Sequence, residues 1–372
     1  MRVQSLLCFL PVLARASPNP AHLQLWTRQE GERPYNSSLQ NVTIFGTGGT
    51  IASVGSSSTE TVGGLGGGYS VGLGVEQVLE AVPELLERAN INTFQVTNEP
   101  SGSINATHLL ELSELIQAEV EKSDISGVVV THGTDTVEET CFFLDLTVKT
   151  DKPIVCTAAM RPATAISADG PLNVLQAVIL ATAPNARGRG AMISLSDRIG
   201  SAFYSTKTHA NALDTFHNFD AGVLGYYINQ VPYFYYSAAL ATGKQYFNVS
   251  GLTSLPKVDI LYSHQDMNPE LFQFSSDNGA EGIVYAGNGA GGISRDARAA
   301  AEEVHNATGK SIVASRKVNT GFATTREWVI GSGFLNPVRA RIFLQLGLTR
   351  GLDNDGIVEL FGTLYPDAWT GE

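Results

Sequence analysis

The chain has 372 residues, of which 43% are hydrophobic and 16% charged, so it has enough apolar side chains for two cores of ordinary size. Its formal net charge is -12, which argues against nucleic acid or an anionic membrane as a partner, because both bind basic surfaces. The acidic balance places no constraint on a small-molecule substrate.

The N-terminus has the pattern of a secretory signal peptide. Arg2 is followed by an apolar run over residues 6–14, and the letters ARAS then offer a cleavage site after Ala16. The run is too short to cross a bilayer. We therefore expect residues 1–16 to be a signal peptide and residues 17–38 a polar leader. The mature protein is expected to be secreted, or held in the cell wall or periplasmic space, with no membrane contact.

Glycosylation motifs fit the same route. Five N-x-S/T sequons give candidate glycan sites at Asn36, Asn41, Asn105, Asn248 and Asn306. Apart from the signal segment the chain has two cysteines, Cys141 and Cys156, and each lies in an apolar run. This placement favours two buried thiols over a disulfide.

From Asn41 onward, short apolar runs alternate with longer amphipathic segments. The expected strands with their following loops are 41–49, 126–136, 152–162 and 190–197. The expected helices are 75–89, 107–123 (with Thr107 as N-cap), 137–149 and 169–183. Such alternation predicts an α/β fold in which helices flank a mainly parallel sheet, here in a larger N-terminal domain over residues 39–232.

The alternation stops over residues 233–254, which are rich in aromatics and glycines and have no clear period, so we interpret them as a linker. It resumes with strands at 257–263, 281–292 and 311–317 and helices at 295–309 and 336–348. Asn336 is expected to cap the last of these helices, with Pro337 at its first position. Residues 255–372 are therefore predicted to form a smaller C-terminal α/β domain.

The first strand ends in a glycine-threonine cluster, TIFGTGGTIAS over residues 43–53. A dinucleotide-binding loop needs a third glycine where this chain has Ile51, and an acidic residue about 20 positions later, where it has glycines and Tyr69. A P-loop needs lysine and a hydroxyl residue after its final glycine, and Thr-Ile follows here. Both nucleotide-binding interpretations fail at the residues that would touch the ligand.

Two strand ends instead present threonine hydroxyls. Thr47 and Thr50 follow the first strand, and the second adds Thr134 and Asp135 beside His132. Open α/β sheets bind their ligands at the carboxyl ends of strands. A threonine hydroxyl is a weak nucleophile that needs a neighbour to take its proton. No G-x-S-x-G, H-E-x-x-H or C-x-x-C motif supports a serine hydrolase or a zinc site.

Four motifs resemble one enzyme family. They are TGGTIA (47–52), THGTDTVEET (131–140), AAMRPATAISADGPLN (158–173) and TKTHANALDTF (206–216), and they resemble the secreted type II members of the bacterial-type L-asparaginases. The resemblance runs from about Asn41 to about Leu348. It implies a two-domain α/β fold and a homotetramer with active sites completed across subunits. It also implies hydrolysis of L-asparagine to L-aspartate and ammonia, without cofactor or metal.

The same resemblance implies roles for five side chains. Thr50 is expected to be the nucleophile that forms the acyl-enzyme, and Tyr69 is expected to hydrogen-bond it. Tyr69 lies in the glycine-rich segment 53–72, which the resemblance favours as an active-site lid over a flexible surface loop. Thr134, Asp135 and Lys207 match a second catalytic group, in which a desolvated lysine can serve as a base and Thr134 relays a proton.

Substrate binding is expected to involve further residues of these loops. Ser101 is expected to bind the α-carboxylate and Asp135 the α-amino group. The backbone N–H groups of Gly49 and Thr134 are the expected oxyanion donors, and the Ala159 carbonyl is expected to accept from the leaving amide. Of the neighbouring polar residues, Thr47 is expected to shape its turn and His132 to be structural.

The chain also departs from the family pattern. Gly102 stands where relatives often have a substrate-binding glutamine, so we expect weaker binding and altered selectivity between asparagine and glutamine. Gly292 stands near the place of an asparagine donated from the neighbouring subunit. Glu327 is the one candidate for the acidic residue that reaches the neighbouring site. Thr150 replaces one cysteine of the bacterial disulfide.

Two alternatives to a dedicated asparaginase remain. The first, which is similar in function, is a dual asparaginase-glutaminase, because pocket shape rejects a substrate with one extra methylene by only about 1–3 kcal/mol. An amino-acid-binding protein without turnover belongs to a different class, and the presence of Thr50, Thr134, Asp135 and Lys207 disfavours it.

Overall fold

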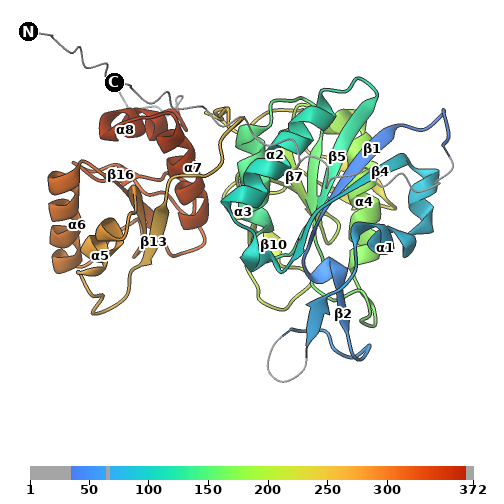
Figure 1. The fold of residues 1–372 in the computed structure, drawn as a ribbon, viewed down its shortest axis with the longest axis horizontal. Coiled ribbons are helices and arrows are strands. Elements are labelled where there is room, and N and C mark those ends of the chain that lie inside the picture. Colours follow the sequence, from blue (N-terminus) through green and yellow to red (C-terminus); the bar gives the residue numbers. More distant parts are fainter. Residues whose placement is uncertain (1–34, 64–67, 366–372) are drawn as a thin grey trace, which may run out of the picture.

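The computed structural model describes residues 35–63 and 68–365, so the expected signal peptide and most of the polar leader lie outside the described residues. Figure 1 shows two α/β domains side by side, as the sequence predicts. The N-terminal domain is built on an eight-stranded sheet in the order β12-β11-β8-β7-β6-β5-β1-β4. Its strands are β1 (Asn41–Gly48), β4 (Asn90–Glu99), β5 (Ile125–Thr131), β6 (Ile154–Thr157), β7 (Ala191–Leu195), β8 (Arg198–Ser201), β11 (Gly225–Ile228) and β12 (Val231–Phe234).

The strands β4, β1, β5, β6 and β7 are mutually parallel. Beyond them β8 pairs antiparallel with β7, β11 with β8, and β12 with β11. Helices cover both faces, as a parallel sheet requires. The N-terminal helices are α1 (Val75–Glu80), α2 (Ala106–Val120), α3 (Val137–Thr147) and α4 (Gly170–Thr182). One apolar core lies between the sheet and α1 and α4, and a second lies between the sheet and α2 and α3. Two small antiparallel pairs stand apart from the sheet, β2 (Ser53–Gly55) with β3 (Tyr69–Val71) and β9 (Thr206–Lys207) with β10 (Phe216–His217).

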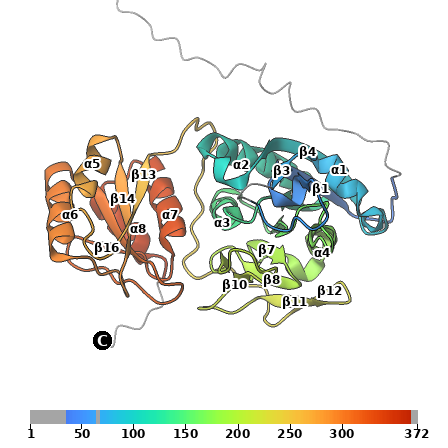
Figure 2. The same ribbon diagram turned by 90° about the horizontal axis from the view of Figure 1, so that it is seen from below.

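The second domain has a four-stranded parallel sheet in the order β13-β14-β15-β16. Its strands are β13 (Val258–Tyr262), β14 (Gly282–Gly287), β15 (Ser311–Arg316) and β16 (Ile330–Gly331). Its helices are α5 (Leu271–Asp277), α6 (Arg295–Thr308), α7 (Pro337–Thr349) and α8 (Asn354–Gly362). Helix α7 faces the N-terminal domain, and α5 and α6 lie on the far side (Figure 2). No helix in the described ranges is both long and apolar enough to cross a membrane.

Several expected boundaries are wrong, for local reasons. The expected helix 75–89 breaks after α1 because Pro83 disfavours helical geometry at Val82, and a 3₁₀ turn (Pro83–Glu87) follows. Helix α2 is capped by Asn105, whose side chain accepts from the backbone of His108, and Thr107 lies inside the first turn. Asn336 does cap α7 with Pro337 at its start, but α8 follows it.

The expected linker begins too early, because Tyr233 and Phe234 belong to the edge strand β12. Most of the remaining segment is exposed, but Phe247 and Val249 are buried. Phe247 is buried in an apolar core that α3 shares with α7, and its ring centroid lies 5.7 Å from that of Phe343. Cys141 and Cys156 are free and buried, as expected, and burial raises the pKa of the Cys141 thiol.

One buried ion pair attaches the linker to the N-terminal domain. Lys244 Nζ lies 2.7 Å from Oδ1 of Asp145, whose side chain is 3% exposed, and the backbone N–H of Ala191 donates to the same oxygen. Burial raises the pKa of Asp145, and the lysine opposes that shift. Removing one partner of such a pair leaves an uncompensated charge in the interior.

We predict that Lys244→Met lowers the free energy of unfolding by about 3–5 kcal/mol at pH 7. The loss should shrink as the pH falls, because an Asp145 carboxyl with a raised pKa becomes protonated in the folded state. Urea unfolding followed by circular dichroism measures both effects. The matched control is Lys257→Met, which removes an exposed lysine 3.9 Å from Asp259 and should cost less than about 1 kcal/mol. Equal losses for the two variants would contradict the prediction.

Candidate active site

Three loops meet at the carboxyl ends of β1, β4 and β5, and glycines allow their backbones to touch. A Cβ on Gly49 would lie 2.3 Å from the Cα of Gly133, and a Cβ on Gly133 would lie 2.7 Å from the Cβ of Ser101. Gly48 and Gly49 also have φ angles of 95° and 82°, which side chains rarely adopt. The sequence therefore needs glycine here to bring Thr50, Ser101 and Thr134 into one region.

Thr50 is the first residue of a 3₁₀ turn (Thr50–Ala52) that follows these glycines. Strands β2 and β3 form a hairpin in which Gly55 pairs with Tyr69, so the chain returns over the turn. The Tyr69 hydroxyl consequently lies 3.3 Å from Thr50 Oγ1. Residues 64–67 of the expected lid lie outside the described residues.

A second polar group lies across the cavity from Thr50. Lys207 Nζ donates to Thr134 Oγ1 at 2.9 Å and to Asp135 Oδ1 at 2.6 Å. Thr134 is buried, the Lys207 side chain is 16% exposed and the Asp135 side chain is 76% exposed. The lysine thus joins a buried hydroxyl to a carboxylate that faces solvent.

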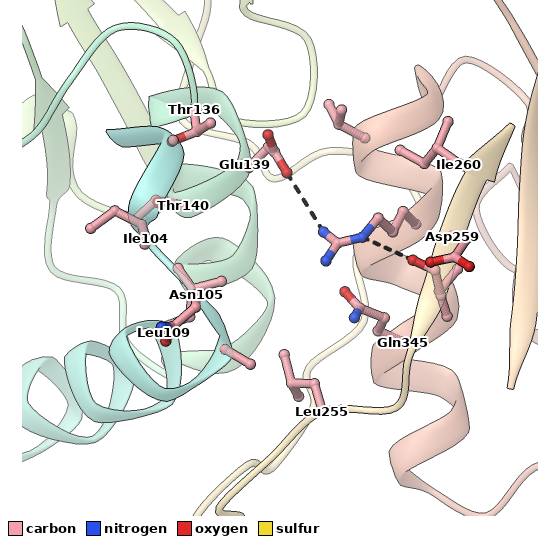
Figure 3. Close-up of a pocket in the computed structure, with 15 residues that line it drawn as sticks. Ile104, Asn105, Leu109, Thr136, Glu139, Thr140, Leu255, Asp259, Ile260 and Gln345 are labelled. Carbon is pink, nitrogen blue, oxygen red and sulfur yellow. Dashed lines mark hydrogen bonds and ion pairs between the residues drawn. The ribbon is translucent and has the colours of Figure 1, made fainter. Parts of the chain in front are cut away.

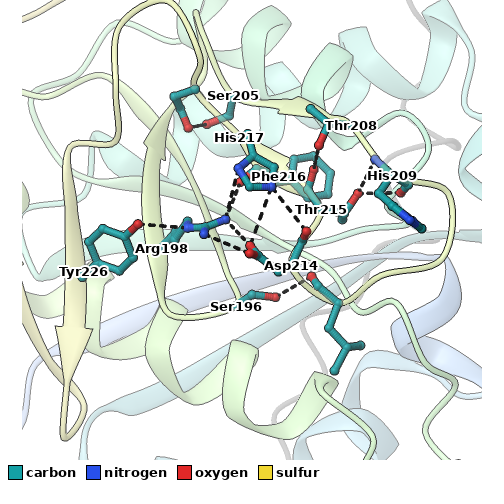
Figure 4. A network of polar contacts seen from close by, with 12 residues as sticks. Ser196, Arg198, Ser205, Thr208, His209, Asp214, Thr215, Phe216, His217 and Tyr226 are labelled. Carbon is teal, nitrogen blue, oxygen red and sulfur yellow. Dashed lines mark hydrogen bonds and ion pairs between the residues drawn. The ribbon is translucent and has the colours of Figure 1, made fainter.

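The hairpin that carries Lys207 is held by its own polar network (Figure 4). The Thr208 backbone and side chain both donate to the Thr215 carbonyl, at 2.8 and 2.9 Å. Arg198 on β8 pairs with Asp214 and donates to the Tyr226 hydroxyl at 3.1 Å. These contacts hold β9 against β10 and so limit where the lysine can reach.

Two cavities of about 280 and 460 Å³ share Thr50, Tyr69 and Asp135 as lining residues. Thr134, Met160 and Lys207 line the smaller cavity, and Gly49 and Ser101 line the larger one. The lining also contains Thr61, Asn98, Glu99 and Asn211, which the sequence analysis did not identify. Asn98 and Glu99 end β4, a strand that the sequence analysis does not predict, and Pro100 separates them from Ser101.

Some expected substrate-binding groups lie elsewhere or are already used. The Gly49 N–H donates to the Glu99 carbonyl at 3.0 Å, so the expectation that it is an oxyanion donor is wrong for this structure. Gly102 is exposed and lines a cleft between the two domains, near Asn105 and Thr136, and not either Thr50 cavity (Figure 3). Ala159 is fully buried directly before Met160.

The two residues expected to serve a neighbouring subunit both lie in the second domain. Glu327 is exposed and pairs with Arg298 at 2.5 Å, while Gly292 forms a bridge with Asn288. Neither lines a cavity that contains Thr50. Among the described residues, no group of three or more histidine, cysteine or acidic side chains is arranged to hold a metal ion.

Thr47 and His132 have structural contacts, in agreement with expectation. Thr47 Oγ1 donates to the Thr131 carbonyl at 3.0 Å. His132 is fully buried between the Gly133 carbonyl, 2.8 Å from Nδ1, and Thr140 Oγ1, 2.9 Å from Nε2. A carbonyl can only accept, so Nδ1 carries the hydrogen and Nε2 accepts from the threonine. Burial lowers the pKa of His132 from 6.5 to about 4, which keeps the ring neutral.

We predict that His132 makes folding less favourable in acid. Its pKa is about 6.5 when unfolded and about 4 when folded, so the unfolded chain binds the extra proton between these values. Protonation of His132 in the unfolded chain lowers the free energy of unfolding by up to about 3 kcal/mol as the pH falls from 6.5 to 4. Urea unfolding across this range should show a weaker pH dependence for His132→Asn than for the unmodified protein. Identical pH slopes would contradict the assignment.

Comparison with known proteins places this geometry in a family. Residues 41–239 match the family model described as "Asparaginase, N-terminal", and residues 257–361 match "Glutaminase/Asparaginase C-terminal domain". The chain is 48% identical over 337 residues to L-asparaginase 2-3 of Saccharomyces cerevisiae, covering 89% of this chain and 92% of that protein. It is 40% identical over 337 residues to L-asparaginase 2 of Escherichia coli, covering 87% and 93%.

A solved structure agrees with the fold as well. The probable cytoplasmic L-asparaginase from Campylobacter jejuni superimposes with a TM-score of 0.82 at 38% sequence identity, covering 87% of this chain and 99% of that one. The two matched family regions fall on the two domains seen here, with the packed linker between them. By sequence, by fold and by both matched domains, the chain belongs to the asparaginase/glutaminase family.

Proposed function

We propose that the protein hydrolyses L-asparagine to L-aspartate and ammonia through a threonine acyl-enzyme. The observation that carries the proposal is the arrangement around the shared cavities. Thr50 Oγ1 lies beside the Tyr69 hydroxyl, and the Lys207 group with Thr134 and Asp135 lines the same space. The relatives' names support the substrate.

In the first step Thr50 Oγ1 attacks the side-chain amide carbon, and a C–O bond forms as the hydroxyl loses its proton. The C–N bond then breaks, and the amide nitrogen leaves as ammonia with that proton. Tyr69 is the hydroxyl within reach of Thr50, and Lys207 with Thr134 supplies the proton path to the leaving group. In the second step water attacks the ester and releases L-aspartate. These side chains need no cofactor for either step.

Substrate recognition is proposed to use charge and backbone groups of the same loops. Asp135 provides a carboxylate for the α-amino group, and Ser101 provides a hydroxyl for the α-carboxylate. Because the Gly49 N–H is used by Glu99, we assign oxyanion binding to the N–H groups of Thr50 and Thr134. Thr50 opens a helical turn, a position whose N–H has no partner within the helix. The Ala159 carbonyl is proposed to accept from the leaving amide.

We further propose secretion, glycosylation and a homotetramer in which neighbouring subunits complete each site. The N-terminal sequence pattern supports the first. Exposed side chains at Asn36, Asn105, Asn248 and Asn306 support the second, whereas Asn41 is half-buried and its amide donates to Asp124 at 3.1 Å. The tetramer is proposed from the family resemblance, and the described residues that line the two Thr50 cavities all belong to the N-terminal domain.

We predict that Thr50→Ala lowers kcat for L-asparagine by roughly 10⁴-fold or more, because it removes the nucleophile. Ammonia release by the purified protein measures it. Thr47→Ala is the matched control, since Thr47 lies in the same loop and donates to a backbone carbonyl. It should cost far less activity. Turnover by Thr50→Ala at the unmodified rate would refute the mechanism, and a folded unmodified protein without turnover would favour the amino-acid-binding alternative.

The same assay with L-glutamine tests the dual-activity alternative. We predict measurable glutamine hydrolysis, because pocket shape rejects one extra methylene by only about 1–3 kcal/mol. Discrimination by shape alone gives kcat/KM values about 10–200-fold lower for glutamine than for asparagine. A ratio above about 10⁴ would show that a specific contact, and not shape, rejects the longer substrate.

A further inference from the structure

Arg339 of the second domain contacts two segments of the N-terminal domain. One leads to Lys207, and the other follows Thr134 and Asp135. Arg339 is on α7, and its side chain is 3% exposed. Its Nε donates to the Ala202 carbonyl at 2.9 Å, and its Nη2 donates to the Ser205 carbonyl. Its Nη1 lies 3.2 Å from Oε2 of Glu138. One planar guanidinium therefore binds two backbone carbonyls and a carboxylate at once.

Each of these partners is close in sequence to a proposed catalytic residue. Ser205 is two residues before Lys207. Glu138 is three residues after Asp135, in the first turn of α3. Both partners are themselves buried, so neither segment can move freely without disturbing the guanidinium. The contacts of Arg339 thus connect the segment carrying Lys207 to the one carrying Thr134 and Asp135.

A second residue at the start of α7 repeats the connection. Asn336 caps the helix through its Oδ1, which accepts from the Arg339 backbone N–H at 3.1 Å. Its Nδ2 lies 3.3 Å from Glu138 Oε2 and 3.5 Å from Thr206 Oγ1, one residue before Lys207. The N-terminal turn of α7 is therefore fixed against both segments by side chains of the second domain.

We infer that Arg339 is a positioning residue: from the second domain, it sets the distances of Lys207 to Thr134 and Asp135. The inference rests on the proposed function, because it assumes that these three side chains take part in hydrolysis. It adds that turnover in the N-terminal domain depends on the docked second domain of the same chain. Arg339 acts through backbone carbonyls and does not line either Thr50 cavity.

The test variant is Arg339→Lys. A lysine keeps the positive charge beside Glu138, but its single ammonium does not reproduce the planar fork that reaches two carbonyls and a carboxylate together. Arg341→Lys is the matched control, because Arg341 is on the same helix and pairs at 3.6 Å with Glu139 of α3. Its Nε donates to Val258, within the second domain, and not to the Lys207 segment. Glu139 lies at the cleft between the domains (Figure 3).

We expect Arg339→Lys to lower kcat for L-asparagine about 10–100-fold, the usual effect of small misplacements of a catalytic group. KM, and the Kd for L-aspartate measured by calorimetry, should change less than about threefold, because the contacts of Arg339 are with Ala202, Ser205 and Glu138 and not with the proposed substrate-binding side chains Ser101 and Asp135 themselves. Arg341→Lys should keep kcat within twofold. A merely structural role would lower the melting temperature of both variants and leave kcat per folded molecule unchanged.

A second variant guards against misfolding. Glu138→Gln/Arg339→Met removes both buried charges, so no lone charge remains in the interior. It should also lose at least about tenfold in kcat, since the carbonyls of Ala202 and Ser205 lose their anchor. Unmodified kcat in either folded variant, while Lys207→Met is inactive, overturns the inference alone. Full activity of Lys207→Met overturns both this inference and the proton path in the proposed function.

Discussion

The site depends on one close approach, the backbone contact between Gly49 and Gly133. These residues follow β1 and β5, neighbouring parallel strands whose carboxyl ends lie at the same edge of the sheet. No side chain fits between the two loops, because a Cβ on Gly49 would fall 2.3 Å from the Gly133 Cα. The contact lets hydroxyls from loops more than 80 residues apart line one space. Glycine is required here by distance and not only by its φ angle.

Around that contact, separate elements of the fold position the polar side chains of the site. The β2–β3 hairpin brings Tyr69 over Thr50, and the β9–β10 hairpin brings Lys207 to Thr134. Buried His132 is directly adjacent to Gly133, and its hydrogen bonds to the Gly133 carbonyl and to Thr140 fix the loop to the first turns of α3. A histidine in this position looks like a base in the sequence, but burial keeps it neutral and its contacts are with the backbone and Thr140.

The two domains are joined by more than a connecting peptide. Phe247 of the linker packs in a core shared by both, Lys244 inserts a charge toward Asp145, and α7 presents Arg339 to Glu138. Such an interface combines apolar burial with charges that are costly to separate. The second domain is therefore a fixed support for the N-terminal domain.

The sequence by itself determined the fold class, the threonine loops and the family. Alternating apolar runs and helical periods predict a parallel sheet, and that sheet places strand ends together. The loops at 47–52 and 131–140 then put Thr50, Thr134 and Asp135 at these strand ends, and the family resemblance implies their catalytic roles. Lys207 and Tyr69 came from resemblance, because an isolated lysine or tyrosine has no local signal for a site. The short strands β8 to β11 escaped prediction, because only their pairing partners define them.

Only the tertiary structure decided the rest. It showed that the Gly49 N–H is already bonded to Glu99, that Gly102 faces a different cleft, and that Asn98 and Glu99 line the Thr50 cavity. It also placed Arg339 beside the segment of Lys207, from more than 130 residues away in the chain. Local patterns fix secondary structure and loop chemistry, because they depend on near neighbours. Whether a backbone N–H is free or already hydrogen-bonded, and which side chains cross between domains, depends on residues that only the folded chain brings together.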